Sequence, residues 1–232
     1  MKTIVSLLAA ASLFALAPVA HAAVVSLNFD ALDGDPGQFE DPLNFYAGGH
    51  GSRGSGPGPD FGITFAGGWG VLCEHSDTCV GSLVVGNPSS PNSIVTTSQK
   101  SFIDVAGGFS EGLDFSWSSQ VTGTIKVWSG LNGTGTLLNT ITLPRQPDGR
   151  NTGNCGPDGV VCPFVSANLP TLGLGHSLEF DGFSGEAAFD DINFANVNLG
   201  VPEPSTWALS ILGFGLAGVS LRRRALKIRA AA

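Results

Sequence analysis

The sequence predicts an all-β protein: a single antiparallel β-sandwich of jelly-roll type, with a barrel as the second choice, flanked by an N-terminal signal helix and a C-terminal transmembrane helix. The chain has 33 glycines, 14 prolines and only 13% charged residues, a composition typical of many turns and few long helices. Short runs of β-branched, aromatic and aliphatic residues recur between turn residues. These runs lie at residues 24–29, 61–66, 82–86, 101–105, 112–118, 122–128, 136–143, 176–180 and 187–194.

The strongest strand signal is GLDFSWS at residues 112–118. Leu113, Phe115 and Trp117 alternate there with polar residues, which predicts a sheet with one apolar and one solvated face. Residues 129–135 are rich in glycine and contain Asn132, so they predict a hairpin whose backbone adopts positive torsions. Residues 33–60 predict a long surface loop without regular structure.

The first 22 residues have the order of a secretory signal peptide. Lys2 precedes an apolar run at residues 4–16, and Ala20 and Ala22 supply the small residues of a cleavage site. Cleavage after Ala22 would leave a mature protein that begins at Ala23, and the alternative is a buried N-terminal helix. The prediction implies the Sec translocon and signal peptidase as partners.

Residues 23–200 predict one exported domain that is strongly acidic. The whole chain has a formal net charge of −8, but six of its eleven basic residues lie near the two ends. An acidic surface repels phosphate backbones, which argues against nucleic-acid binding.

The four cysteines form two close pairs, Cys73 with Cys79 and Cys155 with Cys162, each within a loop-like segment. In an oxidising compartment this arrangement predicts two local disulfides. A zinc site formed by Cys73, His75 and Cys79 is the alternative, although the spacing differs from a Cys-x-x-Cys knuckle.

No catalytic motif emerges from the sequence. HGSRG around Ser52 lacks the first glycine of a nucleophile elbow, and three histidines and several glutamates have no spacing that marks a catalytic set. An exported hydrolase is therefore only the second alternative function. Tryptophans that face solvent could instead stack on sugar rings, which makes Trp69 and Trp128 candidate ligand residues. The alternative is that these aromatic side chains belong to the core. The histidines and glutamates are His50, His75, His176, Glu40, Glu74, Glu111, Glu179 and Glu186.

Asp190 and Asp191 form the clearest local cluster of candidate site residues, and they lie within the predicted last strand. Adjacent strand residues point to opposite faces, so one carboxylate would point inward unless a bulge intervenes. The predicted domain resembles jelly-roll domains, and this resemblance implies a structural calcium where the first and last strands meet. Asp30 follows the predicted first strand. Asp30, Asp190 and Asp191 are therefore candidate calcium ligands, with solvated strand ends as the alternative. No other cofactor is expected.

Residues 201–232 have the order of a sorting signal. Val201, Pro202, Glu203 and Pro204 precede an apolar stretch that ends at three arginines. A helix over about 205–221 would reach roughly 25 Å, shorter than a hydrocarbon core of about 30 Å. Trp207 would mark one interface, and Arg222, Arg223 and Arg224 would stay cytoplasmic, followed by the rest of a basic tail at 222–232.

This ending resembles the PEP-CTERM sorting signal. The resemblance implies that an inner-membrane exosortase recognises the Pro202–Glu203–Pro204 region and passes the exported domain toward the surface of a Gram-negative cell. SGLNGTGTLLNT and AAFDDINF also resemble exported domains that such tails often follow. Family members accompany extracellular polysaccharide and biofilm production, so the predicted function is a non-enzymatic surface or matrix protein. A carbohydrate-binding module for extracellular polysaccharide is the first alternative.

Overall fold

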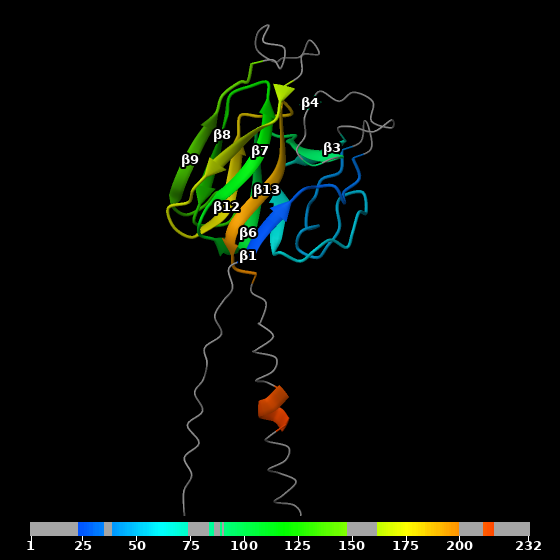
Figure 1. Ribbon diagram of the computed structural model, residues 1–232, viewed down its shortest axis with the longest axis vertical. Helices are drawn as coiled ribbons and strands as arrows, with labels where there is room; N and C mark the ends of the chain where they lie inside the picture. Colours follow the sequence, from blue (N-terminus) through cyan, green and yellow to red (C-terminus); the bar gives the residue numbers. More distant parts are fainter. Residues whose placement is uncertain are drawn as a thin grey trace, which may run out of the picture. The chain divides into compact units, whose positions relative to one another are not determined.

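Strands account for almost all of the regular structure in the computed structural model, which describes residues 23–34, 39–73, 84–85, 89, 91–147, 162–199 and 211–215 (Figure 1). The strands are β1 (Ala23–Leu27), β2 (Ile63–Ala66), β3 (Trp69–Cys73), β4 (Val84–Val85), β5 (Asn92–Thr96), β6 (Lys100–Phe109), β7 (Leu113–Ser119), β8 (Gly123–Trp128), β9 (Leu137–Leu143), β10 (Cys162–Pro163), β11 (Val165–Leu169), β12 (Gly175–Asp181) and β13 (Ala187–Val197).

The strands pair into two layers. In the first layer β13 lies between β7 on one side and β1 and β5 on the other, with β11 beyond β7 and β3 beyond β5. The second layer runs β9, β8, β12, β6, β2. All these pairings are antiparallel, and one pair, Val197 with Phe109, joins the layers. Only the short pair β4 and β10 is parallel among the described strands.

Aromatic side chains from both layers fill the space between them. Phe180 of β12 contacts Phe189 of β13 edge to face, with ring centroids 4.9 Å apart. Trp69 of β3 contacts the same Phe180 ring, also at 4.9 Å. Because strand residues alternate in direction, Leu178 and Phe180 enter this core while Glu179 points to the outer face of the second layer. The predicted all-β sandwich is confirmed.

Each strand that the sequence predicted is present, but three substantial strands were missed. Every residue of β5 is buried, so its sequence lacks the alternation that marks a half-exposed strand. β11 is an edge strand with mostly exposed or half-exposed residues, and β3 contains Gly70. Local pattern is weak in all three cases, and pairing with a neighbour decides the structure.

The irregular segment before β2 is organised by the buried side chain of Glu40. Its carboxylate accepts hydrogen bonds from the backbone N–H groups of Asp33 (2.6 Å), Arg53 (3.0 Å) and Ser55 (3.2 Å). The hydroxyl of Ser55 also donates to it. Burial alone would raise the pKa of Glu40, but these hydrogen bonds outweigh burial and hold the pKa below its usual value. The predicted lack of regular structure is correct for the described part of this loop, but its predicted surface location is wrong for Phe45 and Tyr46, which are buried in the core.

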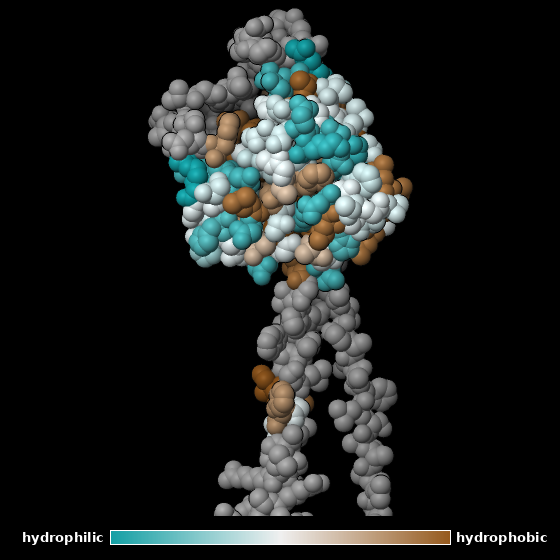
Figure 2. Space-filling model, turned by 180° about the vertical axis from the view of Figure 1, so that it is seen from behind, coloured by the Kyte–Doolittle hydropathy of each residue, from teal (hydrophilic) through white to brown (hydrophobic). Residues whose placement is uncertain are grey.

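His21–Gly200 forms one compact unit, and Met1–Ala20 with Val201–Ala232 forms another. In the second unit, residues 211–215 form a short helical turn. No helix among the described residues is long and apolar enough to cross a membrane, and most of the predicted span at 205–221 lies outside those residues. Seen from behind, the first unit is largely covered by polar and neutral residues, with apolar surface at several points along its lower and right-hand edges (Figure 2).

Candidate functional site

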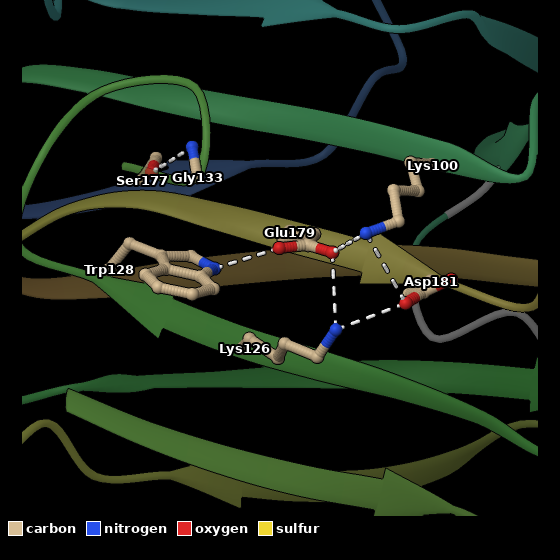
Figure 3. A network of polar contacts seen from close by, with 7 residues as sticks. All are labelled: Lys100, Lys126, Trp128, Gly133, Ser177, Glu179 and Asp181. Atoms are coloured by element: carbon tan, nitrogen blue, oxygen red, sulfur yellow. Dashed lines mark hydrogen bonds and ion pairs between the residues drawn. The ribbon is translucent and has the colours of Figure 1, made fainter. Parts of the chain in front are cut away.

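The outer face of the second layer carries a network of charged side chains from three neighbouring strands (Figure 3). Glu179 of β12 stands between Lys126 of β8 and Lys100 of β6, because both strands pair with β12. Its Oε1 atom accepts hydrogen bonds from Lys100 Nζ at 2.7 Å and Lys126 Nζ at 3.1 Å. Asp181, two residues along β12, contacts Lys126 Nζ at 3.0 Å. Strand register therefore assembles this network.

Trp128, at the end of β8, completes the network. Its indole Nε1–H donates to Oε2 of Glu179 at 2.9 Å, so both oxygens of this carboxylate are engaged (Figure 3). The Trp128 side chain is partly exposed. A partly exposed ring in a fixed orientation is suited to stacking against a flat apolar surface, such as one face of a sugar ring.

The hairpin between β8 and β9 folds back over this face. Asn132 N–H donates to Asp104 Oδ1 at 2.7 Å. Gly133 N–H donates to the hydroxyl of Ser177 at 3.0 Å, and that hydroxyl donates to the Gly130 carbonyl at 2.6 Å. Asn132 and Gly133 have positive φ angles of 53° and 66°, as the sequence predicted for this hairpin. Because the hairpin covers them, Asp104 and Ser177 are buried although they are polar.

The lysines determine the charge state of Glu179. Its side chain is only 5% exposed, and burial would raise the pKa of the carboxyl group. The hydrogen bonds and positive charges of Lys100 and Lys126 outweigh this effect and lower the pKa of Glu179. Glu179 is therefore an ionised hydrogen-bond acceptor in the folded protein. Burial raises the pKa of Asp104 on the same face, against the opposing effect of the Asn132 N–H.

These side chains give a candidate binding surface its chemistry: one aromatic face, two ammonium groups and several carboxylate acceptors. Lys100 is the more open of the two lysines, with a side chain 55% exposed against 23% for Lys126. Its ammonium group can contact a ligand at the surface while it stays paired with Glu179. Sequence reasoning missed the lysines because their proximity to Glu179 depends on the register of three strands.

The predicted ligand role of Trp69 is corrected by its position. Trp69 is 2% exposed and packs against Phe65 and Phe180 within the core. Its indole N–H donates to the carbonyls of Ala66 and Phe102, both at 3.1 Å. The side chain cannot stack on an external ligand, because it lies between the layers. Trp128 remains a candidate.

Two of the three predicted calcium ligands, Asp190 and Asp191, lie on β13, and Asp30 follows β1, which pairs with β13. Asp190 is fully buried and accepts hydrogen bonds from Ser89 Oγ at 2.9 Å and Asp191 N at 2.8 Å. Asp30 accepts one from Asn92 N at 3.2 Å. Burial raises the pKa of Asp190 to about 8, and the charges of Asp191 and Asp30 add to this effect.

The described residues contain no group of three or more His, Cys, Asp or Glu side chains that could hold a metal ion. Asp30 and one of the paired aspartates would thus supply only part of a calcium shell, with carbonyl and water oxygens for the rest. Calcium binding stays a prediction. Asp191 has a φ of 46° at a shift in strand register, so a bulge lies beside the paired aspartates, and Asp190 points inward as the alternation of strand residues predicted.

Several other predicted residues lie partly or wholly outside the described part of the chain. Cys162 is disulfide-bonded, but Cys79 and Cys155 are not among the described residues, so the proposed pairing is untested. Ala23 is the first residue of β1, whereas Ala20, Ala22, His75 and the residues of the sorting motif lie outside. His176 Nδ1 lies 3.3 Å from the Val105 carbonyl oxygen.

Residues 200–224 match the PEP-CTERM protein-sorting motif. The match confirms the resemblance on which the predicted sorting tail rests and indicates an exported protein. It covers the tail alone, so it does not assign a role to the β-sandwich. No curated protein matches the chain significantly.

Among solved structures, the chain is similar to carbohydrate-binding modules. A family 29 module from Piromyces equi is 12% identical, with a TM-score of 0.33 over 58% of this chain and 80% of that module. The module CsCBM6-3 from Clostridium stercorarium, in complex with cellobiose, is 18% identical, with a TM-score of 0.33 over 57% of this chain and 86% of the module. At such scores the similarity carries no argument about ligands, and the site is defined by the contacts above.

Proposed function

We propose that this chain is a non-enzymatic protein of the cell surface or extracellular matrix, processed through its tail by an exosortase. The observation that carries the proposal is the sorting motif at residues 200–224. After export through the Sec translocon and removal of the signal peptide, the tail holds the protein in the inner membrane of a Gram-negative cell until processing. The acidic sandwich then reaches the surface, where its proposed partner is extracellular polysaccharide.

The sorting step is tested by replacing Pro202, Glu203 and Pro204 together with alanine. We expect the full-length variant to accumulate in the inner membrane, because the exosortase no longer recognises it. Fractionation and immunoblotting would detect this form. Lys227→Ala, in the basic tail outside the Pro-Glu-Pro motif, is the control. Normal amounts of mature surface protein in the triple variant would refute the sorting proposal.

We also propose that the sandwich is of the jelly-roll type. The supporting observation is the strand order, in which β5, β13, β7 and β11 form one layer and β6, β12, β8 and β9 form the other. Consecutive strands from β6 to β13 repeatedly change layers, as two interlocked Greek keys require.

Glycan binding on the outer face of the second layer is the second candidate function. Its support is the contrast among the described tryptophans: Trp69 and Trp117 are 2% and 5% exposed, whereas Trp128 is partly exposed and held by Glu179. The ring would stack on a sugar, and Lys100 and Asp181 would contact its hydroxyl groups. No arrangement among the described residues similarly favours the hydrolase alternative.

Binding of the purified protein to a glycan array and to the producer's own polysaccharide tests this candidate. We expect Trp128→Ala to weaken binding by about tenfold or more, since it removes the stacking surface. Phe39→Ala is the matched control, because Phe39 is an exposed aromatic residue that contacts β3 in the other layer. Equal binding by wild type and Trp128→Ala would exclude this face as the site.

A further inference from the structure

Four exposed apolar side chains lie at the end of the sandwich where β13 finishes. They are Val24 (73% exposed), Leu137 (46%), Leu172 (75%) and Leu174 (51%), and are called the leucine rim below. Single exposed apolar residues are ordinary, but a group at one end of a domain often marks a contact surface. Apolar surface is also visible along the lower and right-hand edges of the domain in Figure 2.

Strand pairing places the rim around the last residues of β13. Ala23, beside Val24, pairs with Val197, so β1 begins where β13 ends. The side chain of Leu174 lies against Gly108. The carbonyl of Gly108 accepts a hydrogen bond from Asn198 N–H at 3.1 Å. Leu174 therefore lies next to the chain as it leaves the domain.

The loop at residues 170–174 is fixed against the beginning of β9. Asn139 Nδ2 donates to the Pro170 carbonyl at 2.6 Å, and Gly173 lies close to the side chain of Leu138. Thr171 Oγ1 donates to the Gly173 carbonyl at 3.0 Å. These contacts hold Leu172 and Leu174 at the same end as Leu137.

The sorting motif limits which part of the domain can meet a membrane. Only seven residues separate Leu199 from Trp207, where the predicted apolar stretch begins. Seven extended residues reach at most about 25 Å. A domain of this length is roughly 40 Å across. While the tail is inserted, the end that carries the rim can lie flat on the bilayer. The opposite end cannot, because the seven residues would then have to span the full length of the domain.

We propose that the leucine rim docks on the lipid surface of the inner membrane before the tail is processed. The inference rests on the proposed sorting function, because the tail brings this end to the membrane. Leucine and valine side chains partition favourably into the boundary between head groups and acyl chains. The acidic domain is repelled by anionic lipid, so contact with zwitterionic lipid is stronger. Docking would hold the Pro202–Glu203–Pro204 region at the membrane surface, where a membrane-bound exosortase acts.

The test uses the full chain, reconstituted in phosphatidylcholine vesicles that contain a phosphatidylcholine with a photoactivatable acyl chain. After illumination, mass spectrometry locates the lipid adducts. We expect adducts at residues 136–139 and 170–175 to exceed those at 39–46 by about tenfold, the ratio that burial of a single leucine predicts. Residues 39–46 are a matched reference, because Phe39 and Leu43 are 54% and 42% exposed.

A variant separates docking from proximity. Leu172→Ser with Leu174→Ser should reduce adducts at the unchanged residues 136–139, whereas Leu43→Ser with Val165→Ser should not. If the tail at 207–221 carries lipid adducts but the rim carries no more adducts than residues 39–46, the rim does not dock on lipid. The rim would then be better explained as a surface that binds a protein. Unchanged adducts at 136–139 in the rim variant would mean proximity alone and would also overturn the proposal. A tail without adducts would contradict both membrane insertion and docking.

Discussion

Glu179 and Asp190 are both buried carboxyl groups, yet their pKa values move in opposite directions. Two lysines and an indole N–H donate hydrogen bonds that replace the lost hydration of the Glu179 carboxylate, so Glu179 stays ionised. Asp190 has a serine hydroxyl and a backbone N–H instead, with two further aspartates close enough to oppose its charge. Positive neighbours thus decide which carboxylate tolerates burial as an anion.

Because the pKa of Asp190 is raised in the folded protein, the free energy of unfolding should decrease as the pH rises. Its pKa is about 8 in the folded protein and 3.8 in the reference state, so folding favours the protonated form. The contribution is complete below about pH 4 and is lost as the pH rises to about 8. Without calcium, the unfolding free energy should fall by about 3 kcal/mol between pH 5 and 7.5 through this residue.

Urea unfolding in the presence of a chelator measures this effect. Asp190→Asn should have a smaller decrease between the two pH values than the wild type, because asparagine does not titrate. Glu111→Gln is the control, since Glu111 is exposed. The same decrease in Asp190→Asn and wild type would show that another group causes it.

Calcium binding near Asp30 and Asp191 remains a separate prediction. A cation would reduce the repulsion among the three aspartates and stabilise only the folded state. Millimolar calcium should raise the thermal midpoint of wild type by about 5 °C relative to chelator, if the dissociation constant is about 10 µM. Asp191→Ala should reduce this increase. A midpoint that is insensitive to calcium in both proteins would refute the site.

At the scale of elements, β13 connects most of the fold. It pairs with β7 along one edge and with β5 and then β1 along the other, and its last residue pairs with β6. The register shift between Asp190 and Asn193 separates the part beside β5 from the part beside β1. One long strand can serve several partners because the bulge redirects its backbone between them.

The predicted disulfides belong to the segments that connect these strands. Cys73 ends β3 and Cys162 begins β10, and Cys162 is disulfide-bonded. We expect the bonds Cys73–Cys79 and Cys155–Cys162, each closing a short loop and contributing about 2.5 kcal/mol on the chain-entropy estimate. Peptide mapping under non-reducing conditions identifies the pairs. Four free thiols, or bonds between the two segments, would contradict the prediction.

At the scale of the whole molecule, the sequence predicted the β-sandwich but not its buried details. GLDFSWS formed β7 as expected, since its alternation directly reflects one buried face. NSIVT, now β5, gave no such signal because the sandwich buries both of its faces. Trp69 and Trp128 could not be distinguished by composition, and only the packing of β3 against Phe180 places Trp69 in the core.

The sequence by itself determined the strand-rich class of the domain and the sorting signal, because strand periodicity and the order of a linear motif are local properties of the chain. Tertiary structure alone decided that Glu179 meets two lysines and Trp128, that three aspartates approach one another, and that the leucine rim surrounds the end of β13. Each of these arrangements joins residues far apart in sequence. Their proximity depends on strand register and layer packing, which are fixed only when the two sheets bury their apolar faces together.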